Sequence, residues 1–274
     1  MKPIPRAWVL SSLMCLGSAQ AEDTHQSLRM RDSDEIGVTM SSYSYSEPSL
    51  SVTNNATNFG IAYEKVKSLQ GNEFVLSEME YVTGTDNYSG SGTASIPKYY
   101  FNLKLAYAQT FSIDDYVIAP YVGIGYRFLD QNGAGVTSST GAYAYDRQST
   151  YIYIPIGVKR RDKLQNKGIL ETTTEFNYLL YGNQFSGLSI SNNHGWSNFP
   201  DINNKQNSGY GFYLSAIYKD NDGWSYGPYY KYWNIAQSEK VYSTVKYGST
   251  WYSLTSWEPA NTTNEYGFKV MYKF

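Results

Sequence analysis

The stretch "KYYFNLKLAYAQTF", residues 98–111, shows most directly how this chain folds. Its apolar and polar residues alternate with a period of two, as they do in a β-strand. One face has aromatic rings at both ends and leucines in the middle: Tyr99, Phe101, Leu103, Leu105 and Tyr107. Rings favour the two water interfaces of a bilayer and aliphatic side chains favour its centre. The stretch therefore predicts a lipid-facing transmembrane strand.

Nine further segments show this alternation, some of them weakly. They are residues 36–46, 57–68, 72–83, 116–128, 151–159, 170–180, 210–218, 223–236 and 266–274. An even number of antiparallel strands can close without an edge, which lipid requires because unpaired backbone groups find no water there. We predict an all-β fold: a closed up-and-down antiparallel transmembrane β-barrel over residues 35–274, with ten strands and with eight or twelve as alternatives. A soluble barrel or sandwich would also alternate and stays open.

The connections between these segments alternate in length. The first, third, fifth, seventh and ninth are long, from "SEPSLSVTNNA" to a final stretch of some 25 residues, while those between them are short, as in "SIDD" and "NDG". Transmembrane barrels have short periplasmic turns and long extracellular loops. The pattern predicts that both chain termini lie in the periplasm.

The N-terminal residues have the features of an export signal. Residues 1–21 contain two cations, an apolar stretch and the ending Ala-Gln-Ala, which predict a cleaved signal peptide followed by a short periplasmic segment, 22–34. The mature chain then lacks cysteine and cannot form disulfides. It keeps 20 basic and 24 acidic residues, a net charge of −4, which argues against nucleic acid as a partner.

The inward faces of the predicted strands carry an unusual set of charges. These are Glu64, Glu78, Glu80, Lys104, Arg127, Lys159, Glu171, Glu175, Lys231 and Lys269. Counted from the short turns, Glu78 lies level with Lys104, and Glu171 lies near Lys159. A barrel of this size is little wider than its own side chains, so the charges either pair and fill the lumen or line a narrow pore. The alternation of residues along the strands is the same in both arrangements, so the sequence does not decide between a filled lumen and a pore.

Three prolines lie inside predicted strands, where each removes a hydrogen-bond donor from the sheet. They are Pro120, Pro155 and Pro228. A closed barrel has no free edge to accommodate them, so we expect bulges or weak pairing at these positions.

The sequence offers little to catalysis. Its two histidines are His25, near the N-terminus, and His194, in a long loop. Neither belongs to a recognisable catalytic set, and paired metal ligands are also absent from the sequence. We predict a protein that is not an enzyme, with no catalytic, cofactor-binding or metal-binding residues and no cofactor.

The loops over residues 183–205 and 237–260 are rich in aromatic residues. Their rings are Trp196, Phe199, Tyr242, Tyr247, Trp251, Tyr252 and Trp257. One interpretation is that these rings pack on one another and on lipopolysaccharide. The other is that they form a binding surface for an extracellular ligand.

The C-terminal stretch "EYGFKVMYKF" alternates up to a final phenylalanine, with Tyr266, Phe268, Val270, Tyr272 and Phe274 on one face. With "YIYIPIGVK" and "TEFNYLLYGNQFSGLS", it resembles the porin-like outer-membrane β-barrel family of Gram-negative bacteria. The resemblance implies a location in the cell outer membrane and a C-terminal signal for the barrel-assembly machinery. Two functions stay open: a narrow passive channel for small solutes or ions, and a closed structural or adhesive barrel that acts through its extracellular loops.

Overall fold

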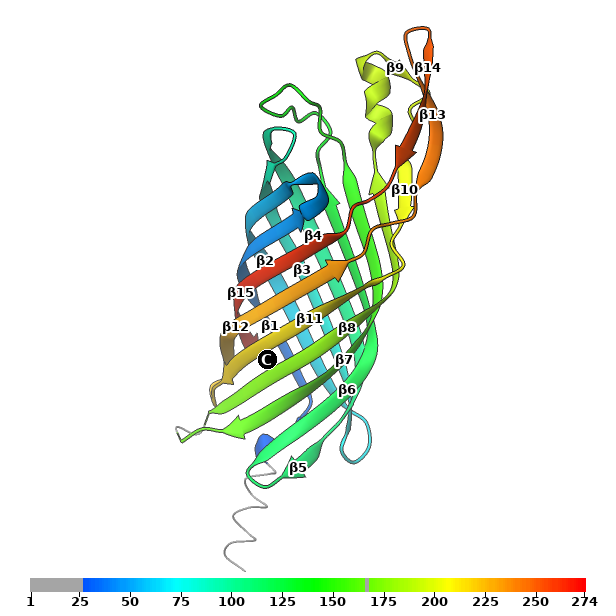
Figure 1. Ribbon diagram of the computed structural model, residues 1–274. Helices are drawn as coiled ribbons and strands as arrows, with labels where there is room; N and C mark the ends of the chain where they lie inside the picture. The colour runs from blue at the N-terminus through cyan, green and yellow to red at the C-terminus, as the bar shows by residue number, and fades with distance from the viewer. Residues whose placement is uncertain (1–26, 166–167) are drawn as a thin grey trace, which may run out of the picture.

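A computed structural model describes residues 27–165 and 168–274. Ten long strands form a closed antiparallel barrel in which each strand pairs with its neighbours along the chain, and the last pairs with the first (Figure 1). The barrel strands are β1 (Ser33–Glu47), β2 (Val52–Ser68), β3 (Glu73–Ser89), β4 (Thr93–Gln109), β6 (Tyr116–Gln131), β7 (Arg147–Lys163), β8 (Ile169–Ser186), β11 (Gly209–Lys219), β12 (Trp224–Ile235) and β15 (Asn261–Lys273). The predicted fold class and strand number are confirmed.

Most strands are longer than their sequence patterns indicated. β3 and β4 have 17 residues each, whereas about 9–11 residues are enough to cross a bilayer. The extra residues lie mainly at the end with the long connections, which we call the loop end; the opposite end is the turn end. Outside the membrane both faces of a strand meet water or polar groups, so the alternation fades there. For this reason stretches such as residues 84–89 were wrongly predicted to be loop.

The connections at the loop end contain secondary structure of their own, but the first two of them, residues 48–51 and 90–92, are short and not long as predicted, because β1 to β4 extend into those stretches. Short elements lie in the first and fourth loops: η1 (Pro48–Leu50), η2 (Leu188–His194), β9 (Trp196–Ser197) and β10 (Ile202–Lys205). In the fifth loop, β13 (Val241–Tyr247) and β14 (Thr250–Ser256) form a hairpin, and β13 also pairs with β9. At the turn end, β5 (Phe111–Ile113) pairs with β6, so the predicted strand 98–111 is in fact divided at Thr110.

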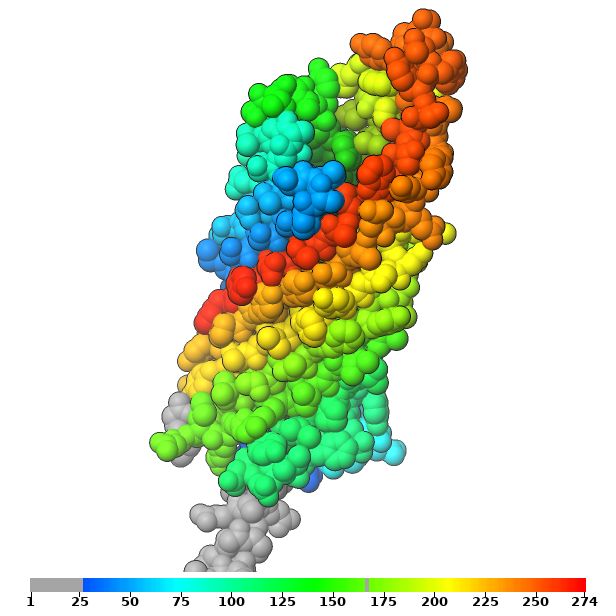
Figure 2. Space-filling view, in the orientation of Figure 1, coloured from blue at the N-terminus to red at the C-terminus, as the bar shows by residue number. Residues whose placement is uncertain are grey.

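The outer surface of the barrel is apolar, as the alternation predicts. Large hydrophobic side chains from nearly all strands face outward, among them Val38, Ile61, Leu105, Val122, Ile124, Ile156, Leu180, Leu214 and Phe268. On the face of the barrel that Figure 2 shows, the strands form a continuous wall. No helix among the described residues is long and apolar enough to cross a bilayer.

The three strand prolines lie where the sheet pairing is interrupted. Pro120 sits between the ends of the β4 and β5 ladders, Pro155 lies in a gap of the β6–β7 ladder, and Pro228 lies in a gap of the β11–β12 ladder. The β7–β8 pairing also shifts register next to Ile152 and Tyr153. Of the expected bulges or weak pairing, weak pairing is found: on one side of each proline the ladder is interrupted, so no donor is required there.

Inward tyrosines fill the lumen by lying over glycines of the neighbouring strand. The residues of each pair are opposite one another in register: Tyr121 and Gly157, Tyr153 and Gly125, Tyr229 and Gly267. A Cβ atom added at Gly125 would lie 2.1 Å from Cζ of Tyr153. A side chain at these glycines would displace the ring, so the glycines make the tyrosine packing possible.

We expect Gly125→Ala to lower the free energy of unfolding by roughly 1–3 kcal/mol, because the new methyl group overpacks against Tyr153. Chemical denaturation in lipid vesicles measures the change. In a double-mutant cycle, Tyr153→Leu should remove most of the penalty of Gly125→Ala. Additive effects of the two substitutions would contradict this account of the packing.

Candidate functional site

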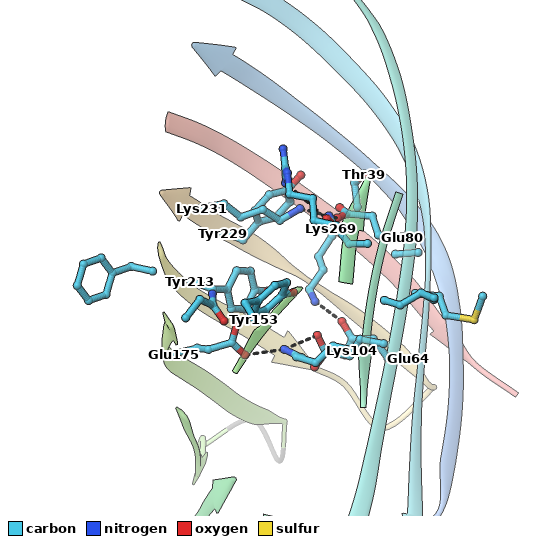
Figure 3. A pocket seen from close by; sticks show the side chains of 18 of the residues that line it. Thr39, Glu64, Glu80, Lys104, Tyr153, Glu175, Tyr213, Tyr229, Lys231 and Lys269 are labelled. Atoms are coloured by element: carbon cyan, nitrogen blue, oxygen red, sulfur yellow. Dashed lines mark hydrogen bonds and ion pairs between the residues drawn. The ribbon is translucent and has the colours of Figure 1, made fainter. Parts of the chain in front are cut away.

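The middle of the lumen contains a buried cluster around Lys104, which points inward from β4. Its Nζ lies 2.7 Å from Oε2 of Glu78 on β3 and 2.7 Å from Oε2 of Glu175 on β8 (Figure 3). The hydroxyl of Tyr121 also donates to Glu175, at 2.6 Å. One ammonium group therefore bridges carboxylates from opposite sides of the barrel. The register of β3 and β4 sets Glu78 opposite Lys104, as predicted.

A second cluster lies nearer the loop end, around Glu265 on β15. This fully buried carboxylate accepts hydrogen bonds from Ser41 at 2.9 Å and from Tyr100 at 2.6 Å. Lys231 lies 3.8 Å from it and 2.6 Å from Glu80. The cluster crosses the lumen, since its members come from β1, β3, β4, β12 and β15.

Further ion pairs fill the lumen toward the turn end. Lys269 pairs with Glu64, and Lys159 lies 3.4 Å from Glu78 and 3.7 Å from Glu171. The predicted proximity of Lys159 and Glu171 is therefore present. Arg127, nearer the loop end, has no ion pair among the described residues; its guanidinium lies 4.5 Å from the centre of the Tyr100 ring and donates to Asn102. All ten predicted interior charges thus lie inside the barrel.

Several interior charges were missed by the sequence analysis. They are Glu35, Glu47, Asp86, Lys98, Arg147, Arg161, Lys219, Glu258 and Glu265. Most lie at strand ends that were assigned to loops. If the inward and outward alternation of each predicted strand is continued by a few residues, it places Asp86, Arg147 and Glu265 on the inward face.

The turn end of the lumen is closed by residues that precede β1. Leu28 is fully buried, and Met30 packs into an apolar cluster with Phe74 and Leu76. Nη1 of Arg161 donates to the backbone carbonyls of Leu28 and Arg29, at 3.0 Å each. The segment beginning at residue 27, blue at the lower end in Figure 1, therefore acts as a short plug. The sequence predicts only a short periplasmic segment here, and the predicted signal peptide lies outside the described residues.

A series of small cavities runs along the lumen, and neighbouring cavities share wall residues. A turn-end cavity of about 390 Å³ shares Glu64 with a central cavity of about 90 Å³. The central cavity shares Arg127 and Trp233 with one of only about 30 Å³. That volume holds one or two water molecules and no hydrated solute. In this conformation the lumen is closed between the central cavity and the loop end.

A polar cluster around Arg147 lies at the loop end of the lumen. Its guanidinium pairs with Glu258, in the connection between β14 and β15, and lies 3.2 Å from Oε1 of Glu47. The hydroxyl of Tyr45 donates to Glu47 at 2.6 Å. The guanidinium therefore fastens the base of the fifth loop to β7 and to the end of β1.

Burial raises the pKa of Glu258, and Glu47 adds to this, although Arg147 opposes it. Between the ordinary value of 4.5 and the raised value, the folded chain binds more protons than the unfolded chain, so stability falls as the pH rises through this interval. We expect Glu258→Gln to abolish that part of the pH dependence, as measured by denaturation midpoints over a pH series. Glu239→Gln, in the exposed part of the same loop, is the control and should leave the dependence unchanged. A wild-type dependence in Glu258→Gln would contradict this assignment.

The fourth and fifth loops together form a projecting unit that we call the arm, residues 188–205 and 241–256, which rises above the other loops (Figure 1). Trp196 holds it together, with ring centres 5.6 Å from Phe199, 5.0 Å from Tyr247 and 5.8 Å from Tyr252. Some of the predicted loop rings thus pack on one another. Tyr242 and Trp251 stay exposed, at 75% and 57%.

In the part of the chain that the structure describes, His194 does not belong to a catalytic cluster, and no metal-binding cluster is present. The His194 ring is stacked on Tyr143, with centres 3.6 Å apart, which joins the third and fourth loops. Within residues 27–165 and 168–274, no group of three or more His, Cys, Asp or Glu side chains could hold a metal ion. His25 lies outside these ranges.

No protein-family model and no curated protein sequence matches the chain. Among solved structures, it is similar to the outer membrane protease OmpT from Escherichia coli, with 9% identity, 90% of this chain and 100% of that chain covered, and a TM-score of 0.48. It is also similar to the translocator domain of the autotransporter NalP from Neisseria meningitidis (10% identity, 97% and 98% covered, TM-score 0.43) and to the Pseudomonas putida toluene transporter TodX (8% identity, 91% and 91% covered, TM-score 0.35).

The structure of the chain itself defines its class. A closed, even-stranded antiparallel sheet satisfies its backbone hydrogen bonds internally, an apolar surface surrounds it, and charged side chains fill its interior. The protein is therefore a ten-stranded β-barrel of the outer-membrane type.

Proposed function

We propose that the protein is an integral outer-membrane barrel whose lumen is closed to solutes and whose activity lies in the arm at its loop end. The structure of the lumen supports the proposal that it is closed. Ion pairs bridge the lumen at Lys104, and one of its cavities, of about 30 Å³, is too small for a hydrated ion. Three of the five connections at the loop end are long, residues 132–146, 187–208 and 236–260, whereas the connections at the turn end are all short, which favours an orientation with both termini in the periplasm.

A planar bilayer recording of the purified full chain tests the closed lumen. We expect no conductance steps from the wild-type protein. Insertion into the bilayer is verified by a variant that lacks residues 27–30 and in which Arg127 and Trp233 are also truncated to alanine, since the loss of Leu28 and Met30 opens the turn end and the two truncations open the level above it. This combined variant should give large steps, whereas deletion of residues 27–30 alone should leave the lumen closed at the level of Arg127 and Trp233. Steps from the wild type would contradict the proposal.

Such steps would support a second function, a narrow passive channel. The specific observation in its favour is that each cavity in the series shares wall residues with the next one, so small rotamer changes could join them. Water and small ions would then pass between the interior charges. In that case, neutralising Glu78 and Lys104 separately should change the ion selectivity in opposite directions.

The arm supports the second half of the proposal, binding of an extracellular ligand. In the arm, Lys246 lies 5.7 Å from the centre of the Trp251 ring, and directly beside the arm Lys240 lies 5.6 Å from the centre of the Trp257 ring. Exposed rings beside ammonium groups suit a glycan that carries phosphate or sulfate groups, since the rings can stack on sugar faces while the lysines pair with the anions. The cell's own lipopolysaccharide and a sulfated host glycan share this chemistry.

Truncation of the exposed rings tests this binding. We expect Trp251→Ala/Lys246→Gln to weaken binding to immobilised lipopolysaccharide or to heparin by roughly tenfold or more, as for loss of a central aromatic anchor. Thr137→Ala, in the third loop outside the arm, is the control. Preference for one of the two surfaces identifies the source of the ligand, and equal binding by both variants to both surfaces would refute the proposal.

We also propose that the barrel has no catalytic role. The described histidine, His194, is stacked on Tyr143 and lies outside the charge clusters of the lumen.

A further inference from the structure

The loop-end mouth of the barrel contains a cavity of about 210 Å³ that the arm does not line. It lies beneath the third loop, residues 132–146, which packs beside the connection between β3 and β4: the backbone N–H of Ser139 donates to the carbonyl of Thr93, and Thr140 donates to the carbonyl of Ser91. Figure 2 shows these two loops side by side, in green and cyan, at the upper end of the barrel. Tyr143 lines the cavity and is 56% exposed, so the cavity reaches the surface there.

The walls and the floor of this cavity differ in chemistry. The walls are mainly apolar, with Leu50, Val52 and Ile96 from the barrel rim and Tyr143 and Tyr145 from the third loop. The floor is polar and consists of Glu47, Asn54, Gln131 and Arg147. A ligand that fits both parts has an apolar body and a polar group at one end.

Two atoms of the floor have no hydrogen-bond partner within residues 27–165 and 168–274. Oδ1 of Asn54 is an unpaired acceptor on a side chain that is 2% exposed, and Nε of Arg147 is an unpaired buried donor. Both residues line this cavity and also the 30 Å³ cavity below it. Buried polar groups in proteins normally have hydrogen-bond partners. The unpaired donor and the unpaired acceptor at this floor would both gain a partner from one ligand group that can donate and accept hydrogen bonds. A hydroxyl or a carboxamide does so.

The charges at the floor select against an anion. Arg147 already pairs with Glu47 and Glu258, so two carboxylates surround one guanidinium. Gln131 of the floor donates to Asp86, whose charge is balanced by Lys98 at 2.6 Å. A ligand carboxylate would meet like charges here, whereas a neutral polar group would not.

We propose that this mouth is a binding site for a small neutral molecule with an apolar body and a terminal hydroxyl or carboxamide group. The body occupies the cavity under the third loop, and the polar group donates to Oδ1 of Asn54 and accepts from Nε of Arg147. The cavity is smaller than the roughly 300–1,000 Å³ of sites for drug-sized ligands, so the ligand is correspondingly small. No residue of the arm lines the site, although Tyr143 in its wall is stacked on His194 of the arm. The two tests change different residues and use different ligands, so either proposal can fail without the other.

Ligand-observed NMR on the full chain in detergent micelles, with empty micelles subtracted, tests the site. The probes are cyclohexanecarboxamide and cyclohexanecarboxylate, which share one apolar body. We expect the amide to bind and the carboxylate to bind at least about tenfold more weakly, the factor that corresponds to one neutral hydrogen bond.

Asn54→Leu removes the acceptor and should weaken the binding of the amide about tenfold. The matched control is Asn55→Leu, the next residue of β2, which points outward and should leave binding unchanged. Ala94→Phe fills the cavity and should abolish binding. Each variant is first shown to fold by its electrophoretic shift on heating. The proposal is overturned if the amide shows no binding beyond that to empty micelles, or if Asn54→Leu and Ala94→Phe bind it as the wild type does, in which case only water occupies the floor.

Discussion

Lys104→Met is expected to lower the free energy of unfolding by about 3–5 kcal/mol, the usual cost of leaving a buried charge without its partner. Lys104 bridges Glu78 and Glu175 at 2.7 Å each, and its side chain is 7% exposed. Glu78 keeps Lys159 as a second partner, at 3.4 Å. The loss of stability therefore comes mainly from Glu175, which is left as a buried charge without an ion-pair partner. Lys104 is its one such partner among the described residues.

Two further variants make the prediction specific. Lys65→Met breaks an ion pair with Asp34 of similar length, 2.9 Å, but its side chain is 43% exposed, so the change should be within about 1 kcal/mol. The double variant Lys104→Met/Glu175→Gln removes both charges and should recover most of the stability lost by Lys104→Met alone. Urea denaturation in lipid vesicles measures all three.

The same experiment bears on the function of the lumen. A water-filled pore would screen Glu175 and reduce the penalty of Lys104→Met toward that of Lys65→Met. A large penalty indicates a dry, closed interior. A small penalty would contradict the closed lumen and favour the narrow channel, independently of any conductance recording.

Much of the barrel could be predicted because lipid imposes a simple pattern on the strands. The segment 98–111 shows it clearly, since lipid on one side and charge on the other enforce strict alternation. The register followed from the short turns, which place Glu78 opposite Lys104. Both results depend on local geometry, which the sequence contains.

The loop end could not be predicted in the same way because it lies outside the membrane. Arg147, Glu47 and Glu258 come together from the ends of β7 and β1 and from the fifth loop, 100 residues or more apart in sequence. The hairpin of β13 and β14 did leave a signal, since "VYSTVKY" and "TWYSLTS" flank the turn at Gly248 and Ser249. The plug left none: Leu28 and Met30 are two apolar residues among polar ones, and their burial depends on the closed barrel.

Removal of the ring of Phe274 should greatly reduce the amount of protein that reaches the outer membrane in cells. The side chain is 72% exposed at the turn end, and its backbone N–H donates to the carbonyl of Asp34 at 3.0 Å, which holds the last residue in the sheet. We propose that this ring, with those of Tyr266, Phe268 and Tyr272, is read by the barrel-assembly machinery. Fractionation of cells that express Phe274→Ala measures the effect.

Phe111→Ala separates recognition by that machinery from simple contact with lipid. Phe111 is 45% exposed on β5, also at the turn end, so it loses the same ring at the same interface without altering the C-terminus. In pure lipid vesicles, where no machinery is present, both variants should lose similar stability, at most about 1.5–3 kcal/mol. In cells only Phe274→Ala should accumulate outside the membrane. If both variants accumulated equally outside the membrane, Phe274 would act only through its contact with the lipid interface. Normal outer-membrane levels of Phe274→Ala would show that the machinery does not depend on the terminal phenylalanine.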